Sequence, residues 1–164
     1  ALNSKIYVDK SALISYTNSV LKTEQRFVCV SRPRRFGKSM TANMLVLIME
    51  KTLILILFFK ISFRDLLKAF PNIDYLSSED LIGVLFDIYT QTSEAFIFII
   101  DEWDCIFQEH KSDSDSQKLY LDFIRGLLKD QSYVALAYMT GILPIKKYGS
   151  HSALNMFDEF SMAN

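Results

Sequence analysis

The chain has 164 residues, of which half are apolar and 23% are charged, a balance that suits one globular domain with its own core. The net charge of −1 excludes a general attraction to nucleic acid or to an anionic membrane. Cys29 and Cys105 lie in apolar surroundings without C-x-x-C spacing, so we expect reduced core residues of a cytoplasmic protein. No signal peptide is apparent, and the two ends, Ala1 and Asn164, suggest a fragment of a longer protein.

The first fifty residues predict a helix, a strand and a second helix. Asp9 is a good helix N-cap, and apolar residues recur near helical spacing over residues 10–22. Residues 26–31 predict a strand that is apolar enough to be buried on both faces, as parallel strands are. A turn with Pro33 and Gly37 follows, and then a helix over about 38–50.

Residues 53–63 form an unusually apolar stretch. Its seven consecutive apolar residues are too few to span a bilayer and favour a buried strand. A second hypothesis is a frameshift, because one allowed set of codons for residues 47–63, read one base out of frame, encodes an ordinary helix end and a polar turn. A nucleotide sequence that does not permit this shifted string would rule the hypothesis out.

The remainder continues to alternate helices with apolar strands. We expect helices over 64–70, from Ser77–Asp80 onward, over 116–129 and over 152–158, and strands over 95–101 and 133–139. Such alternation predicts an α/β fold with a mainly parallel sheet, formed by one domain over residues 1–164. Ligands of such sheets bind at the carboxyl ends of the strands, where three motifs meet in this prediction.

The first motif is a phosphate-binding loop, or Walker A motif, between the strand at 26–31 and the next helix. The pattern G-x-x-x-x-G-K-[ST] would place its first glycine at position 32, which holds Arg32. Gly37 lets the backbone approach a phosphate, Lys38 brings positive charge to the outer phosphates, and Ser39 offers a hydroxyl to Mg²⁺. The predicted nucleotide-binding residues are Arg32, Pro33, Arg34, Arg35, Phe36, Gly37, Lys38, Ser39 and Met40. Taken alone, the G-K-S triplet is equally compatible with an ordinary helix start.

The other two motifs end later strands. Asp101 follows the apolar run Phe96–Ile100, as does the Walker B aspartate that helps to hold Mg²⁺ in P-loop nucleotidases. Glu102 is placed to orient and deprotonate an attacking water, and Thr140 to contact the γ-phosphate or that water. The alternative is that Asp101 and Glu102 only cap a strand end and that Thr140 only satisfies backbone groups.

Other polar residues receive no site role. Asp104, Glu109, Asp113 and Asp115 are interpreted as a solvated loop, since no histidine spacing matches a metal site. The cluster Arg32, Arg34 and Arg35 can contact phosphates, lie solvated, or bind another subunit or nucleic acid. We expect Trp103 and Tyr120 in the core or at its rim.

Three strings together resemble one known group: S-R-P-R-R-F-G-K-S at 31–39, F-I-F-I-I-D-E-W-D at 96–104 and A-Y-M-T-G-I-L-P-I-K-K at 137–147. They are similar to the predicted bacterial AAA-ATPase-like family, as is Y-V-D-K-S at 7–11, and an arginine at the first glycine position is usual in that family. The resemblance implies a P-loop NTPase-type three-layer sandwich of the additional-strand type. It further implies Lys38 and Ser39 at phosphate and Mg²⁺, Asp101 at Mg²⁺ and Glu102 as catalytic base.

The sequence also departs from the pattern of this family in one segment. Family members usually have a longer segment with another core strand between the phosphate loop and the acidic strand, and often a C-terminal nuclease-like domain. We therefore expect a sandwich truncated in the middle and at the C-terminus, with the 53–63 stretch either in that strand's place or produced by a frameshift.

The sequence thus predicts an ATP-binding domain with Mg²⁺-dependent hydrolysis. The alternatives are a non-hydrolysing nucleotide-binding or interaction module and a degraded remnant of a longer ATPase. The predicted partner is a nucleotide, with a protein partner or self-association left open. Nucleic-acid binding has no support from the net charge, and no membrane association is expected.

Overall fold

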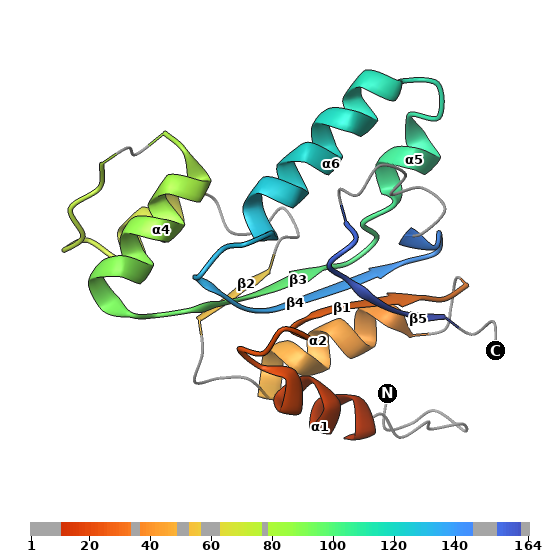
Figure 1. Cartoon of the computed structure of the whole chain (residues 1–164), viewed down its shortest axis with the longest axis horizontal. Coiled ribbons are helices and arrows are strands. Elements are labelled where there is room, and N and C mark those ends of the chain that lie inside the picture. Colours follow the sequence, from red (N-terminus) through yellow and green to blue (C-terminus); the bar gives the residue numbers. More distant parts are fainter. Residues whose placement is uncertain are drawn as a thin grey trace.

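The computed structural model describes residues 11–33, 37–48, 53–56, 63–76, 79–145 and 154–161. Its centre is a five-stranded sheet in the order β2-β3-β4-β1-β5, with every neighbouring pair parallel (Figure 1). In chain order the strands are β1 (Phe27–Ser31), β2 (Leu53–Ile56), β3 (Phe96–Ile100), β4 (Val134–Gly141) and β5 (Asp158–Ser161). The predicted mainly parallel sheet is confirmed.

Helices cover both faces of this sheet. The helices are α1 (Ser11–Val20), α2 (Lys38–Ile48), α3 (Phe63–Ala69), α4 (Leu81–Thr92), α5 (Cys105–Glu109) and α6 (Ser114–Leu128). Residues of α1 and α2 pack against one face, and residues of α3 to α6 pack against the other (Figure 1). The molecule is therefore the predicted α/β three-layer sandwich.

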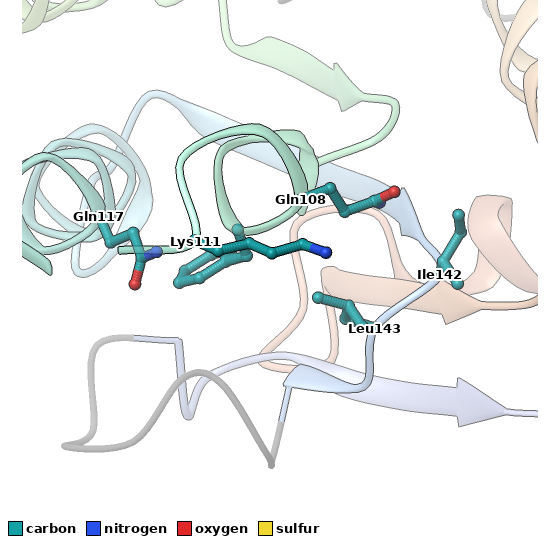
Figure 2. A pocket seen from close by; sticks show the side chains of 6 residues that line it. Gln108, Lys111, Gln117, Ile142 and Leu143 are labelled. Carbon is teal, nitrogen blue, oxygen red and sulfur yellow. The ribbon is translucent and has the colours of Figure 1, made fainter. Parts of the chain in front are cut away.

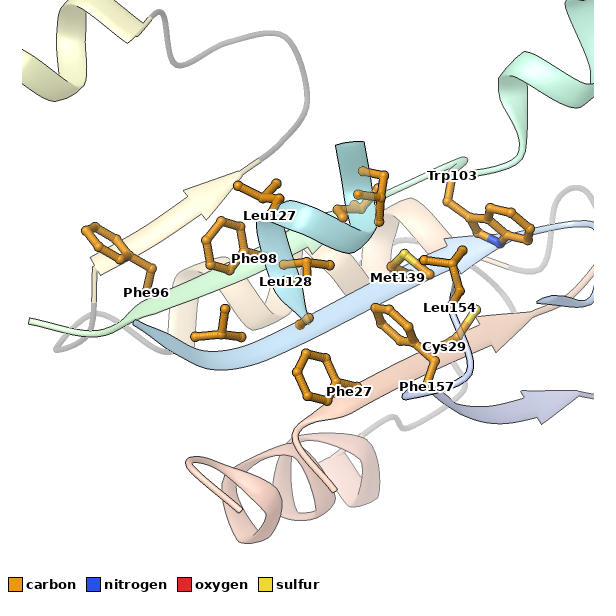
Figure 3. Close-up of a cluster of buried hydrophobic side chains, with 14 of the residues drawn as sticks. Phe27, Cys29, Phe96, Phe98, Trp103, Leu127, Leu128, Met139, Leu154 and Phe157 are labelled. Carbon is orange, nitrogen blue, oxygen red and sulfur yellow. The ribbon is translucent and has the colours of Figure 1, made fainter. Parts of the chain in front are cut away.

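Alternate residues of the central strands enter two separate cores. Phe96 and Phe98 of β3 pack with Leu127 and Leu128 of α6 (Figure 3). The intervening residue Ile97 packs on the opposite face in the cluster that contains α2. Because successive side chains of a strand point to opposite faces, a strand between two helical layers needs an unbroken apolar run, and β3 and β4 have one.

Strand β4 separates the phosphate-loop strand from the acidic strand. It pairs with β1 on one side, where Val30 lies opposite Thr140, and with β3 on the other, where Ile100 lies opposite Met139. The sequence predicted these three strands but not their order, and β4 lies between the other two. The carboxyl ends of the three strands consequently lie next to one another.

Strand β2 lies at the edge of the sheet, parallel to β3. The strand interpretation of the apolar stretch therefore holds for Leu53–Ile56, and the truncation of the sheet stays a prediction. The rest of that stretch, at 57–62, lies outside the described residues. The frameshift hypothesis stays a prediction for the nucleotide sequence.

The predicted helix over 152–158 is wrong in its described part. Residues 154–156 form a turn, and β5 then runs beside β1. Leu154 and Phe157 are buried, and the Phe157 ring packs edge-on against Phe27 with 5.6 Å between ring centroids. Two buried residues three apart suit a helix or a turn equally, so their spacing could not distinguish the two. Asp9, predicted as a helix N-cap, lies outside the described residues.

The two cysteines differ in environment, which gives a first testable prediction. Cys29 is fully buried in β1, and burial raises its thiol pKa to about 12, whereas Cys105 is only partly buried. A thiol with that pKa is about 10⁻⁴ ionised at pH 8, so Cys29 should react with a thiol reagent only after unfolding. Burial also raises the thiol pKa of Cys105, but its partial exposure lets a reagent reach it, so we expect one thiol that reacts in the native protein and none in a Cys105→Ser variant. Two thiols that react at the same rate in the native protein would contradict this burial.

Candidate functional site

The carboxylate of Asp101 joins two of the predicted site residues. Ser39, in the first turn of α2, donates its hydroxyl hydrogen bond to Asp101 Oδ2. Thr140, near the end of β4, donates its hydroxyl hydrogen bond to Asp101 Oδ1. Three segments that lie far apart in the sequence therefore meet at one carboxylate, at the edge of the sheet where parallel α/β proteins bind their ligands.

Gly37, the residue before α2, has a backbone conformation that favours glycine. Gly37 has a φ of 70°, a left-handed conformation that residues other than glycine rarely adopt. Its carbonyl accepts hydrogen bonds from the Thr41 backbone N–H at 3.1 Å and the Thr41 hydroxyl at 3.0 Å, which fixes the first turn of the helix. Ser39 and Met40 on that turn are exposed. The start of α2 therefore exposes Ser39 to solvent beside Asp101.

The other predicted loop residues are described only in part. The backbone N–H of Arg32 donates to the Gly141 carbonyl at 3.0 Å, which extends the pairing of β1 with β4 by one residue. Pro33 is exposed. Arg34, Arg35, Phe36 and the side chain of Lys38 lie outside the described residues.

Glu102 protrudes from a sharp turn after β3. Its side chain is exposed and its φ is 53°, which is rare for a residue with a side chain. The Glu102 carbonyl accepts the backbone N–H of Cys105 at 2.9 Å, and the next residue, Trp103, donates its backbone N–H to the Thr140 carbonyl at 3.0 Å. The turn thus presents Glu102 to solvent next to the Asp101 carboxylate.

The interpretation of Asp104 as part of a solvated loop is wrong. Its side chain is completely buried, and Oδ2 accepts the backbone N–H groups of Ile142 at 3.0 Å and Leu143 at 2.9 Å. The same oxygen accepts the Gln108 side-chain amide at 3.0 Å. In the sequence Asp104 is one of several acids in a polar stretch, so no local signal separates it from Asp113 and Asp115. Trp103 is also buried, in agreement with its predicted place in the core.

A second carboxylate holds the segment after β4 from the opposite side. The Ser31 hydroxyl at the end of β1 donates to Glu159 Oε1 of β5 at 2.7 Å, and it lies 3.3 Å from the Leu143 carbonyl. Glu159 Oε1 also accepts the backbone N–H of Ile145 at 3.1 Å. Residues 142–145 are therefore fixed between the acidic turn (residues 101–104) and the strands β1 and β5. Sequence reasoning missed Ser31 and Glu159, because the pairing of β5 with β1 was not predicted.

A pocket of about 500 Å³ adjoins this segment (Figure 2). Its lining combines apolar side chains with one cation and two amides, from Phe107, Gln108, Lys111, Gln117, Ile142 and Leu143. Gln108 and the 142–143 backbone are also hydrogen-bond partners of Asp104, so the pocket adjoins the acidic turn through these residues.

No group of three or more His, Cys, Asp or Glu side chains in the described part of the chain is arranged to hold a metal ion. None of the described helices is both long and apolar enough to cross a membrane.

The fold and the meeting of Ser39, Asp101 and Thr140 define a P-loop-type α/β sandwich with its candidate site at the carboxyl edge of the sheet. A family model described as predicted AAA-ATPase matches residues 2–53. This stretch includes α1, β1, the Gly37 loop and α2, and the match supports a nucleotide-binding, ATPase-like role. No curated protein matches the chain.

Proposed function

We propose that this domain binds ATP with Mg²⁺ at the carboxyl edge of its sheet and hydrolyses it. The observation that carries the proposal is the Asp101 carboxylate, which accepts hydrogen bonds from Ser39 at the start of α2 and from Thr140 on the neighbouring strand. A P-loop site needs a hydroxyl after the phosphate-binding turn and a strand-end aspartate within reach of the same cation. The described geometry supplies this pair.

The residues present fit a magnesium ion. Mg²⁺ prefers oxygen ligands and usually takes one or two from the protein, with phosphate oxygens and water completing the octahedron. Ser39 Oγ and Asp101 Oδ2 are two such oxygens, and Ser39 is exposed, so a phosphate can reach it. When bound there, Mg²⁺ would neutralise charge that develops on the phosphate oxygens.

The phosphates themselves would lie over the Gly37 turn and the first turn of α2. The orphan N–H groups and the dipole of a helix start favour an anion, and the positive φ of Gly37 brings the backbone close to it. Lys38 adds a compact positive charge at the outer phosphates, and Arg34 or Arg35 is proposed to pair with phosphate oxygens.

Hydrolysis would rest on Glu102 and Thr140. Glu102 is exposed immediately after Asp101, where its carboxylate can orient a water molecule and accept its proton. Thr140 holds the other Asp101 oxygen and can respond to the γ-phosphate or to the lytic water. Positioning and electrostatic stabilisation would thus supply the catalysis, as is general for phosphoryl transfer.

The test is an ATP titration of a Lys38→Ala variant in the presence of Mg²⁺. Loss of a charge-assisted contact to phosphate should weaken ATP affinity by about 10- to 100-fold. Lys118→Ala, which removes an exposed lysine of α6, is the matched control and should bind as the wild type does. Equal affinity of the Lys38→Ala variant and the wild type, in folded samples, would refute a phosphate site at this loop.

A further inference from the structure

The acidic turn and the segment after β4 are joined by hydrogen bonds that the sheet itself does not provide. The pairing of β3 with β4 ends at Ile100 opposite Met139. Beyond it, three bonds continue the connection: Trp103 N–H to the Thr140 carbonyl, and the Ile142 and Leu143 N–H groups to Asp104 Oδ2. These bonds flank both Glu102 and Thr140, the two residues to which hydrolysis was assigned.

We propose that Asp104 is a positioning residue, whose buried carboxylate clamps residues 142–143 to the acidic turn and so fixes Thr140 and Glu102 relative to each other. This inference rests on the proposed function for the roles of those two residues. The clamp itself is a property of the folded chain, so it can be tested without nucleotide.

The burial of Asp104 makes the clamp strong. Its side chain has no exposed surface, and one oxygen accepts three N–H donors at 2.9–3.0 Å. Hydrogen bonds to a charged acceptor are stronger than neutral ones, and donors that lose their acceptor in a buried place are costly. The segment after Thr140 therefore has one strongly preferred position.

The second oxygen of Asp104 lies in a tightly packed place beside Gly141. Among the described residues, Asp104 Oδ1 and Trp103 Nε1 are buried atoms without a hydrogen-bond partner. Both face Gly141, and a Cβ added there would lie 3.0 Å from Oδ1 and 2.4 Å from Nε1. Only a glycine at position 141 leaves room for the Trp103 ring and the Asp104 carboxylate beside β4.

The consequence for the site concerns Glu102. It lies between Asp101, which is bonded to Ser39 and Thr140, and Trp103, which is bonded to Thr140 and buried. Its left-handed φ of 53° is unfavourable for a glutamate and persists because the residues on either side are held. Loss of the Asp104 hydrogen bonds should therefore shift the Glu102 carboxylate. The phosphate loop should shift less, because it contacts the acidic turn through Asp101.

The experiment uses Asp104→Asn in the full chain, with Asp122→Asn on the exposed side of α6 as the matched control. The asparagine conserves volume but removes the charge, and one of its two amide positions becomes a donor that faces other donors. We expect turnover per folded molecule to fall by about 10- to 100-fold while ATP affinity stays within about threefold, because misplacement affects catalysis more than binding. The control should retain both.

A readout independent of nucleotide follows the clamp directly. Trp103 is the single tryptophan, so its indole N–H gives one resonance in a ¹H–¹⁵N spectrum. In Asp104→Asn this resonance should shift, and the Ile142 and Leu143 amides should exchange with solvent at least about tenfold faster, while amides within β4 keep their protection. If the variant does not fold, the wild type provides the test. Slow exchange of the Ile142 and Leu143 amides would support the clamp, and unprotected amides at these positions would refute it.

The outcomes separate the two proposals. A wild type that binds no nucleotide refutes the proposed function, whereas the amide exchange still tests the clamp. Unchanged turnover and exchange in Asp104→Asn refute the positioning role even if ATP is hydrolysed. A lower melting temperature with unchanged turnover per folded molecule also refutes it, since Asp104 would then stabilise the fold without placing the site residues.

Discussion

Glu102→Gln should lose nearly all ATP turnover, by about 10²- to 10⁴-fold, while its ATP affinity stays within about threefold of the wild type. Glutamine conserves the shape of the side chain but cannot accept a proton from water. The binding groups assigned to the phosphates and to Mg²⁺, from Gly37 to Ser39 and at Asp101, are unchanged by this substitution. Phosphate release at saturating ATP, together with an equilibrium ATP titration, measures the two quantities separately.

The control for this prediction is Glu94→Gln, which changes another exposed glutamate just before β3. It should leave turnover and affinity unaltered. Retained turnover in Glu102→Gln would refute the assignment of the base, and an equal loss of affinity would place Glu102 among the binding groups instead. A folded wild type that binds ATP without turnover would favour the non-hydrolysing module.

Much of the fold could be predicted because burial on both faces leaves a plain sequence signal. The runs that became β1, β3 and β4 are uninterrupted in apolar residues, as a strand covered by helices on both sides requires. The helix that begins after Asp80 was predicted from its polar start, and Asp80 caps it by accepting the N–H groups of Ile82 at 3.2 Å and Gly83 at 3.1 Å. The position of β4 between β1 and β3 was not predicted, since periodicity carries no information on strand order.

The site was predictable only where a motif determines it. Asp101 stands out because it ends an apolar strand, and its two partners come from motifs with a known order along the chain. Asp104 and Glu159 have no such signal, because their partners are distant in the sequence. Asp104 accepts the N–H of Leu143, about 40 positions away, and Glu159 accepts the hydroxyl of Ser31, about 130 positions away. Local patterns report which residues are apolar or turn-forming, but not which distant backbone groups a carboxylate will meet.

Gly141→Ala should be the most destabilising conservative change in this part of the molecule, by about 3 kcal/mol. The added Cβ would lie 2.4 Å from Trp103 Nε1 and 2.6 Å from Trp103 Cδ1, closer than nonbonded atoms can approach. Trp103 is 1% exposed and its ring packs against Phe107, with 5.7 Å between ring centroids, so it cannot move aside into solvent. The strain would have to be relieved by shifting the end of β4 or the acidic turn.

Gly126→Ala is the matched control, because it makes the same chemical change inside α6. There the added Cβ would meet only Ile82 Cδ1 at 3.5 Å, an ordinary contact. Alanine is also a better helix former than glycine, so this variant should gain about 0.5–1 kcal/mol. Urea unfolding followed by circular dichroism gives both free energies. Equal stabilities of the two variants would contradict the close approach of Trp103 to Gly141.

A double-mutant cycle with Trp103→Leu would show that the cost arises from this contact. The two nearest atoms to the added Cβ belong to the indole ring, so removal of the ring should reduce the cost of Gly141→Ala by about 1–2 kcal/mol. If the cost were unchanged, the strain would come from the β4 backbone or from Asp104 Oδ1 at 3.0 Å instead. Because Thr140 immediately precedes Gly141, a shift of the strand end would also displace the hydroxyl that donates to Asp101. Loss of stability in Gly141→Ala should therefore be accompanied by loss of turnover, whereas Gly126→Ala should retain full turnover.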